Sequence, residues 1–211
     1  PVALLLACAF QCTDPAPPPS GFSYDELVDL EVTFTDGETT NVIVRMPRDP
    51  AGPCGWPLIV FTHGLFGQRT SVAHLAREFA EAGYATLTYD VRGHDTASGY
   101  HTLWGQRERL DLVELIQWTQ ASYPGLVDPT RTGLGGVSQG GILSFDGAAW
   151  SGLPIEPNPW MSGTYPTIAA IVVENFSAEF SATFAPDGLG MHTNAAAALL
   201  GITSVRFDPQ L

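Results

Sequence analysis

Residues 135–141 read GGVSQGG, and they contain the pattern Gly-x-Ser-x-Gly centred on Ser138. The preceding segment, 131–137, is typical of a short buried strand, and a segment typical of a helix begins at Gln139. A serine at such a junction needs small neighbours so that the chain can reverse, and the start of the helix offers backbone N–H groups to an anion. The stretch therefore predicts a nucleophile elbow with Ser138 as the nucleophile. The simpler alternative is an ordinary glycine-rich start of a helix.

Strand and helix patterns alternate on both sides of this stretch. The segments 30–34 and 41–46 alternate apolar and polar residues about Asp36-Gly37, which predicts an antiparallel hairpin. Further along, continuous apolar runs predict buried strands and periodic apolar residues predict helices. The strands are expected at 57–62, 84–89 and 167–173, and the helices at 70–82, at 106–121 and from 139 onward. This order predicts a mostly parallel, doubly wound sheet with an antiparallel N-terminal hairpin, in three α/β/α layers.

A second loop with unusual residues, HGLFG at 63–67, directly follows the strand at 57–62. In a doubly wound sheet it would lie at the same edge as Ser138. We expect it to supply one backbone N–H to an oxyanion, from Leu65 or alternatively from Phe66. The N–H of Gln139 would be the second donor. His63 is expected to brace the loop through hydrogen bonds.

A third loop, DVRGHD at 90–95, follows the strand at 84–89. We expect Asp90 and Arg92 to form an ion pair that fixes this loop. His94 is a candidate for the catalytic base by its residue type, but the base of a triad in this chain order normally follows the nucleophile.

Together these residues resemble the α/β-hydrolase superfamily. The resemblance covers roughly residues 30–175 and is carried by PLIVFTHG at 57–64, DVRGH at 90–94 and GVSQGG at 136–141. The stretch from Arg92 to the elbow is similar to the branch that contains X-Pro dipeptidyl-peptidases, cocaine-esterase-like enzymes and dienelactone-hydrolase-like esterases. The resemblance implies a Ser-His-Asp/Glu triad, an acyl-enzyme intermediate, no metal and no cofactor.

The partners of the nucleophile are expected in the order serine, acid, histidine. Glu174, at the end of the last predicted strand, is the acid candidate, and a solvated carboxylate at the edge of the pocket is the alternative. His192 is the base candidate because no other histidine follows Ser138. The strands that normally precede a catalytic histidine are missing, so we expect the histidine, and the acid with it, beyond Leu211. Residues 24–211 then form an incomplete α/β-hydrolase domain that lacks its C-terminal strands, with 175–201 as a lid or cap.

The N-terminal residues have the composition of an export signal. Residues 1–12 resemble a signal peptide or the remnant of a lipoprotein signal, and 13–23 form a proline-rich tether. The tetrad Leu-Leu-Ala-Cys ending at Cys8 resembles a lipobox, so Cys8 is a candidate for lipid attachment. A cleaved signal or a buried apolar segment is the alternative. In an oxidising compartment Cys12 could pair with Cys54.

Composition narrows the function further. All nine basic residues among the 211 are arginine, which excludes lysine Schiff bases, pyridoxal-phosphate anchoring and the P-loop lysine. The net charge of -13, with no arginine cluster, argues against nucleic acid as a partner. The sequence predicts an exported hydrolase, secreted or lipid-anchored, that cleaves an ester or amide of a small-molecule or peptide acyl substrate through Ser138. The alternative is a surface binding protein that keeps the hydrolase fold without a complete triad.

Overall fold

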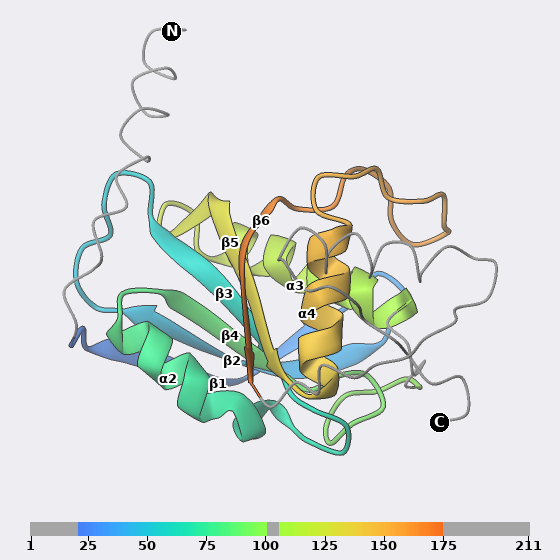
Figure 1. The fold of residues 1–211 in the computed structure, drawn as a ribbon, viewed down its shortest axis with the longest axis horizontal. Helices are drawn as coiled ribbons and strands as arrows, with labels where there is room; N and C mark the ends of the chain where they lie inside the picture. The colour runs from blue at the N-terminus through green and yellow to red at the C-terminus, as the bar shows by residue number, and fades with distance from the viewer. Residues whose placement is uncertain (1–20, 101–105, 175–211) are drawn as a thin grey trace, which may run out of the picture.

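A computed structural model of the chain describes residues 21–100 and 106–174. Its centre is a six-stranded sheet with the order β1-β2-β4-β3-β5-β6 (Figure 1). The strands are β1 (Tyr24–Thr33), β2 (Thr39–Pro47), β3 (Trp56–Thr62), β4 (Ala85–Tyr89), β5 (Val127–Val137) and β6 (Ile168–Glu174). β2 pairs antiparallel with β1 and with β4, and the other neighbours pair parallel. The predicted mixed sheet is therefore confirmed.

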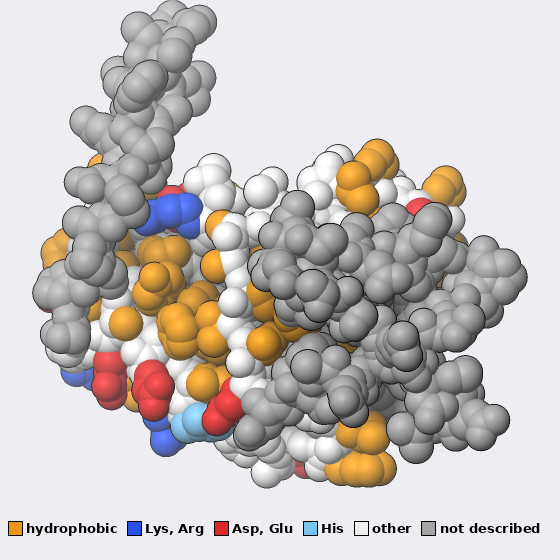
Figure 2. Space-filling model, in the orientation of Figure 1, with side chains coloured by type: hydrophobic (Ala, Val, Ile, Leu, Met, Phe, Trp, Pro, Cys, Tyr) orange, Lys and Arg blue, Asp and Glu red, His pale blue; other side chains and the backbone are white. Residues whose placement is uncertain are grey.

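Helices cover both faces of the sheet. They are η1 (Arg69–Val72), α2 (Ala73–Glu81), α3 (Gln106–Ser122) and α4 (Gln139–Ala149). Side chains of β3 alternate between the faces: Leu58 and Val60 share a core with residues of α3 and α4, whereas Ile59 and Phe61 share a core with α2. Figure 2 shows hydrophobic side chains gathered on the face of the sheet that α2 covers. The three-layer α/β/α arrangement is confirmed.

The N-terminal hairpin is longer than its apolar pattern predicts. β1 starts at Tyr24. The pattern misses its first half because an edge strand exposed to water needs no apolar alternation there. Its pairing with β2 is irregular between Leu27 and Leu30, where Asp29 has a φ of 54°. Such a bulge interrupts the two-residue period of the side chains, which hides this part of the strand from an analysis of periodicity.

The parallel strands bring three loops to one edge of the sheet. Thr62, the last residue of β3, lies opposite Tyr89 at the end of β4 and opposite Gly136 near the end of β5. The segments that follow these strands are those that carry HGLFG, DVRGHD and Ser138. The fold thus assembles the predicted loops side by side.

Several predictions concern residues outside the described part of the chain. These are the signal segment 1–12, most of the tether 13–23, the lid 175–201 and His192. Within the described residues, no helix is both long enough and apolar enough to cross a bilayer.

Candidate active site

Ser138 occupies a sharp turn between β5 and α4. Its φ of 54° and ψ of -116° lie in a region that a residue with a side chain rarely adopts, at a typical cost of about 1–3 kcal/mol. The Ser138 carbonyl accepts the first N–H groups of the helix, from Gly141 at 3.0 Å and from Ile142 at 3.3 Å. The Ser138 side chain is exposed at this edge. This is the strained strand-to-helix geometry that a nucleophile elbow requires, and the role of Ser138 as nucleophile remains a prediction.

Two glycines make the turn possible because backbone segments meet there in direct contact. A Cβ atom on Gly140 would lie 2.0 Å from the Thr62 carbonyl oxygen, so the first turn of α4 rests on the end of β3. A Cβ atom on Gly136 would lie 2.3 Å from the carbonyl carbon of Gly140. Neither contact leaves room for any side chain, which explains the glycine spacing around Ser138.

The loop after β3 lies directly against this turn. A Cβ atom on Gly64 would lie 3.2 Å from Ser138 Cβ and 3.8 Å from Ser138 Oγ. The Gly67 N–H donates to the Gly64 carbonyl at 2.9 Å, and Phe66 has a φ of 62°, the pattern of a type II turn. Leu65 and Phe66, the two alternative oxyanion donors, are exposed at the tip of this turn, while Gln139 begins α4 beside Ser138. All three predicted donors therefore belong to backbone that adjoins the elbow.

His63 braces the loop, as expected. The Val91 N–H donates to its Nε2 at 3.0 Å, so Nε2 carries no proton, and Nδ1–H donates to the Gly64 carbonyl at 2.7 Å. The side chain is 1% exposed. His94 is also buried, and its ring packs edge-on against that of His63 with centroids 5.1 Å apart. The two buried rings thus pack against each other where the loops after β3 and β4 meet.

The predicted ion pair between Asp90 and Arg92 is wrong. Asp90 instead bonds to Arg69, whose backbone N–H donates to Oδ1 at 2.7 Å and whose Nη1 donates to Oδ2. Arg92 donates two hydrogen bonds to Asp111 of α3, from Nε at 2.7 Å and from Nη2 at 2.6 Å. The chain turns between the two residues, so Asp90 faces η1 and Arg92 faces α3.

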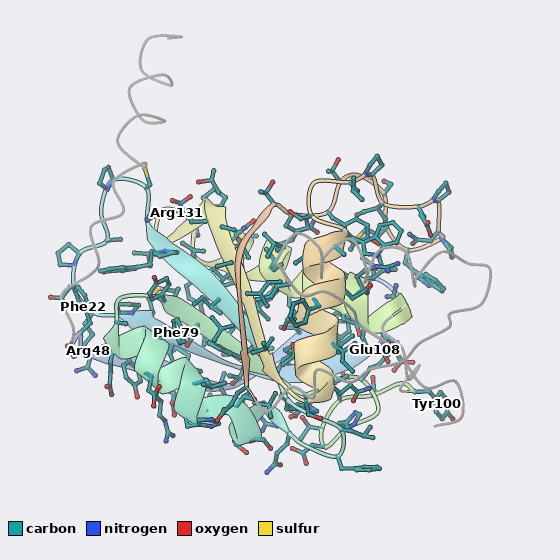
Figure 3. All side chains as sticks on the ribbon, in the orientation of Figure 1. Phe22, Arg48, Phe79, Tyr100, Glu108 and Arg131 are labelled. Atoms are coloured by element: carbon teal, nitrogen blue, oxygen red, sulfur yellow. The ribbon has the colours of Figure 1, made fainter. Side chains whose placement is uncertain are left out.

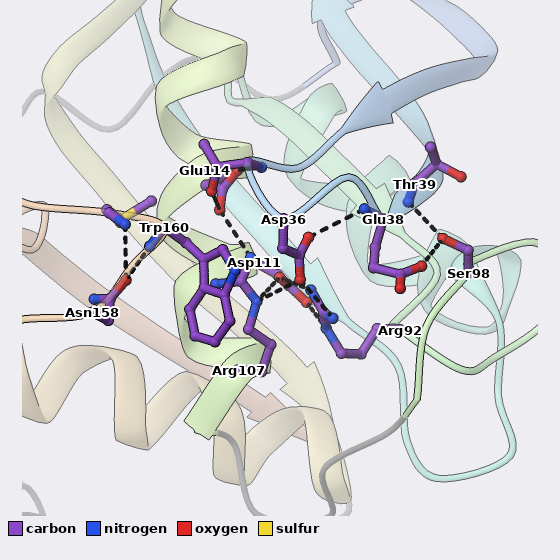
Figure 4. A network of polar contacts seen from close by, with 12 residues as sticks. Asp36, Glu38, Thr39, Arg92, Ser98, Arg107, Asp111, Glu114, Asn158 and Trp160 are labelled. Atoms are coloured by element: carbon purple, nitrogen blue, oxygen red, sulfur yellow. Dashed lines mark hydrogen bonds and ion pairs between the residues drawn. The ribbon is translucent and has the colours of Figure 1, made fainter.

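Arg92 is part of a buried charged network between the β1–β2 turn and α3 (Figure 4). The Arg92 network consists of Asp36, Arg92, Arg107, Asp111 and Glu114. Burial raises the pKa of Asp111 to about 6, although Arg92 opposes the shift. Burial alone would lower the pKa of Arg92, but the hydrogen bonds and charges of Asp111 and Asp36 outweigh it and raise that pKa. The Trp160 ring covers Arg107 at 4.6 Å from the guanidinium carbon to the ring centroid, which ties the segment after α4 to the same network.

Glu174, the acid candidate, ends β6 next to the elbow. The Ser138 N–H donates to the Glu174 carbonyl at 3.3 Å, so the two backbones are in contact. The Glu174 carboxylate lies 2.8 Å from Nε2 of His74 in α2, and about half of each side chain is exposed. No sequence pattern signals this contact, because the two residues are 100 positions apart. The roles of Glu174 and His192 in a triad remain predictions.

Known proteins share part of this sequence. Residues 36–154 match the X-Pro dipeptidyl-peptidase (S15) family. The chain belongs to this family. Membership confirms the predicted superfamily and places the chain among the hydrolases. A relative from Escherichia coli, an uncharacterized 31.7 kDa protein in the traX-finO intergenic region, is 34% identical over 118 residues. These residues cover 55% of this chain and 41% of the relative, so this S15-family chain spans less than half of the relative's length.

Solved structures resemble the S15-family chain in fold. The α/β hydrolase GrgF from Penicillium sp. sh18 is 21% identical with a TM-score of 0.53, and the match covers 85% of this chain and 56% of that one. Vibralactone cyclase is 18% identical with a TM-score of 0.53, covering 84% and 48%. The hypothetical protein PA2218 from Pseudomonas aeruginosa is 16% identical with a TM-score of 0.54, covering 77% and 45%. At these identities the likeness shows the α/β-hydrolase fold.

Proposed function

We propose that the protein is a serine hydrolase that cleaves an ester or amide bond through an acyl-enzyme on Ser138. The observation that carries the proposal is the conformation of Ser138, a residue with a side chain at a φ of 54° that is held at the open edge of the sheet. Strain of this kind persists only where the surroundings impose it, and here the Gly136 and Gly140 contacts do so.

The chemistry would proceed by acyl transfer. Ser138 Oγ attacks the substrate carbonyl carbon as a base takes the hydroxyl proton, and the carbonyl oxygen becomes an oxyanion. The N–H groups of Gln139 and of Leu65, or alternatively Phe66, stabilise that charge. Collapse of the intermediate breaks the ester or amide bond, and the base returns the proton to the leaving alcohol or amine. Water then attacks the acyl-enzyme in the same way and releases the acid.

The base and the acid are proposed from the end of β6 and the chain that follows it. Glu174 and His192 are the candidates in the order serine, acid, histidine, and the segment beyond Leu211 is the other source. Because Glu174 ends the strand next to Ser138, a histidine that reached Ser138 from this side would pass near its carboxylate.

We also propose that the protein is exported and acts on a small-molecule or peptide acyl substrate. The apolar residues 2–10 and the proline-rich tether support export, with a lipid on Cys8 as one form of attachment. Cys54 is disulfide-bonded, which fits an oxidising compartment, and its predicted partner Cys12 lies outside the described residues. The acidic net charge favours a substrate other than nucleic acid.

Turnover by the protein expressed from its complete reading frame tests this function. We expect hydrolysis of p-nitrophenyl acetate or of glycyl-prolyl-p-nitroanilide, the first an ester and the second an X-Pro amide. Ser138→Ala should lower kcat by at least about 10³-fold, while Ser151→Ala, just beyond the C-terminal end of α4, should not change it. No hydrolysis by the wild type, or equal rates in the two variants, would favour the binding-protein alternative.

A further inference from the structure

Asp90 is a fully buried carboxylate at the sheet edge that the proposed chemistry does not use. It directly follows β4 and is 0% exposed. Its carboxylate accepts hydrogen bonds from the backbone N–H and the guanidinium of Arg69, and from the Thr96 hydroxyl at 2.6 Å. Its carbonyl accepts from the Thr40 hydroxyl at 2.7 Å, which fixes Asp90 itself to β2. Because both of its oxygens accept hydrogen bonds in a buried site, this carboxylate is a rigid anchor for the residues that donate to it.

Arg69 is the residue that the anchor holds. It begins η1, directly after the loop that carries Leu65 and Phe66. Its guanidinium also reaches Asp29 of β1 at 2.7 Å and Asp95 at 3.2 Å. Both the backbone and the side chain of Arg69 are thus fixed on Asp90, which sets where the loop must end.

The other end of the same loop is tied to the residue next to Asp90. His63 accepts the Val91 N–H and donates to the Gly64 carbonyl, at the point where Gly64 meets Ser138. Asp90 and Val91 therefore hold the loop at its two ends, and only Gly64 to Gln68 span the distance between. A loop of five residues with both ends fixed has little freedom to shift its N–H groups.

We infer that Asp90 is a positioning residue for the oxyanion hole, and that it acts through Arg69. The inference rests on the proposed function of Ser138. Asp90 itself touches no reacting atom, since its side chain is fully buried and its carboxylate is bonded to Arg69 and Thr96. It fixes the backbone N–H of Leu65 or Phe66 at the place where the oxyanion forms. Because this charge forms only in the transition state, a displaced donor lowers kcat more than it raises KM.

The chain offers a matched control for Asp90. Asp128, near the start of β5, is 1% exposed and accepts the same set of hydrogen bonds, from a backbone N–H, a hydroxyl and an arginine. Val127, beside Asp128, lies opposite Trp56 at the start of β3 and Gly136 lies opposite Thr62 at its end, which places Asp128 roughly 20 Å from Ser138. Figure 3 labels Arg131, its arginine partner, at the opposite end of the molecule from Tyr100 of the β4–α3 loop. A substitution at Asp128 therefore measures the effect of losing a buried aspartate that does not contact the loop after β3.

The experiment compares Asp90→Asn with Asp128→Asn in the protein from the complete reading frame, using p-nitrophenyl acetate hydrolysis and urea unfolding. We expect comparable losses of stability, a kcat about 10²-fold lower only in Asp90→Asn, and a KM within about threefold of wild type in both. Equal kcat values in the two variants, with an active wild type, would overturn this inference alone. A wild type that hydrolyses no ester would overturn the proposed function and this inference together.

A second pair of variants keeps the test decisive if Asp90→Asn does not fold. Arg69→Met removes the guanidinium and keeps the backbone N–H, whereas Arg69→Lys also keeps the charge. We expect Arg69→Met to lower kcat by about 10-fold or more and Arg69→Lys to recover part of that loss. Equal kcat values in both variants and the wild type would contradict a role that passes through Arg69.

Discussion

Gly140→Ala should separate the elbow from the strand that supports it. The added Cβ would lie 2.0 Å from the Thr62 carbonyl oxygen, 2.5 Å from the Thr62 carbonyl carbon and 2.7 Å from the His63 carbonyl oxygen. All three neighbours are backbone atoms, so no side chain can rotate away. To restore the 3.4 Å of ordinary contact, the start of α4 and the end of β3 must move apart by about 1.4 Å.

The expected cost follows from that displacement. Overpacking of this kind lowers the free energy of unfolding by about 1–3 kcal/mol, and rigid backbone on both sides points to the upper end. A displacement near 1 Å at a reacting group also costs about 10²-fold in rate, so kcat should fall by that amount. Urea unfolding measures the first effect, and ester hydrolysis or the rate of fluorophosphonate labelling measures the second.

Gly52→Ala is the matched control for Gly140→Ala. Gly52 has no atom within 4 Å of an added Cβ and no positive φ. We expect its stability to stay within about 0.5 kcal/mol of wild type and its rate to be unchanged. If Gly140→Ala behaved like Gly52→Ala in both assays, the close contact between α4 and β3 would be refuted, and with it the account of how Ser138 is held.

Two further predictions concern strain and pH. Ser138→Gly should be more stable than Ser138→Ala by about 1 kcal/mol in urea unfolding, because only glycine adopts a φ of 54° without strain; equal stabilities would argue against a strained elbow. The buried Asp111 carboxyl, with its pKa raised from 3.8 to about 6, should destabilise the fold by up to about 3 kcal/mol as pH rises from 4 to 6.5. The sign follows because the folded protein binds this proton more tightly than the unfolded chain does. Asp111→Asn should flatten that part of the stability curve, and an unchanged slope would contradict the pKa shift.

Local pattern was enough to predict the parallel strands, the helices and the tight strand-to-helix turn at Ser138, but not the first half of β1. In β3, the continuous apolar run that ends at Phe61 indicated a strand covered on both faces, and the two cores on either side confirm it. Around Ser138, the glycine spacing indicated a turn too tight for side chains. The structure agrees, because Cβ atoms added to Gly140 and Gly136 would lie only 2.0 Å and 2.3 Å from backbone atoms. These features are local, so neighbouring residues carry the information.

The charged contacts could not be predicted because their partners are remote in the chain. Arg107, Asp111 and Glu114 interrupt the apolar positions of α3 and look like residues of a solvated face, yet all three are buried. Their burial is compensated by remote partners: Arg92 donates to Asp111, Asp36 accepts from Arg107, and Thr35 donates to Glu114.

The wrong pairing of Asp90 with Arg92 has the same origin. The two residues are close in sequence, which favoured the prediction of an ion pair. Their side chains point in different directions, so each binds a residue from another part of the chain. Asp90 binds Arg69, 21 positions away, and Arg92 binds Asp111, 19 positions away.

Covalent labelling tests most directly whether Ser138 is a nucleophile. The protein from the complete reading frame would be treated with a fluorophosphonate probe, digested and examined by peptide mass spectrometry. We predict one adduct, on the peptide that contains Ser138, and no adduct in Ser138→Ala. Absence of label on Ser138 in folded wild-type protein, or equal labelling of the Ser138→Ala variant, would contradict it.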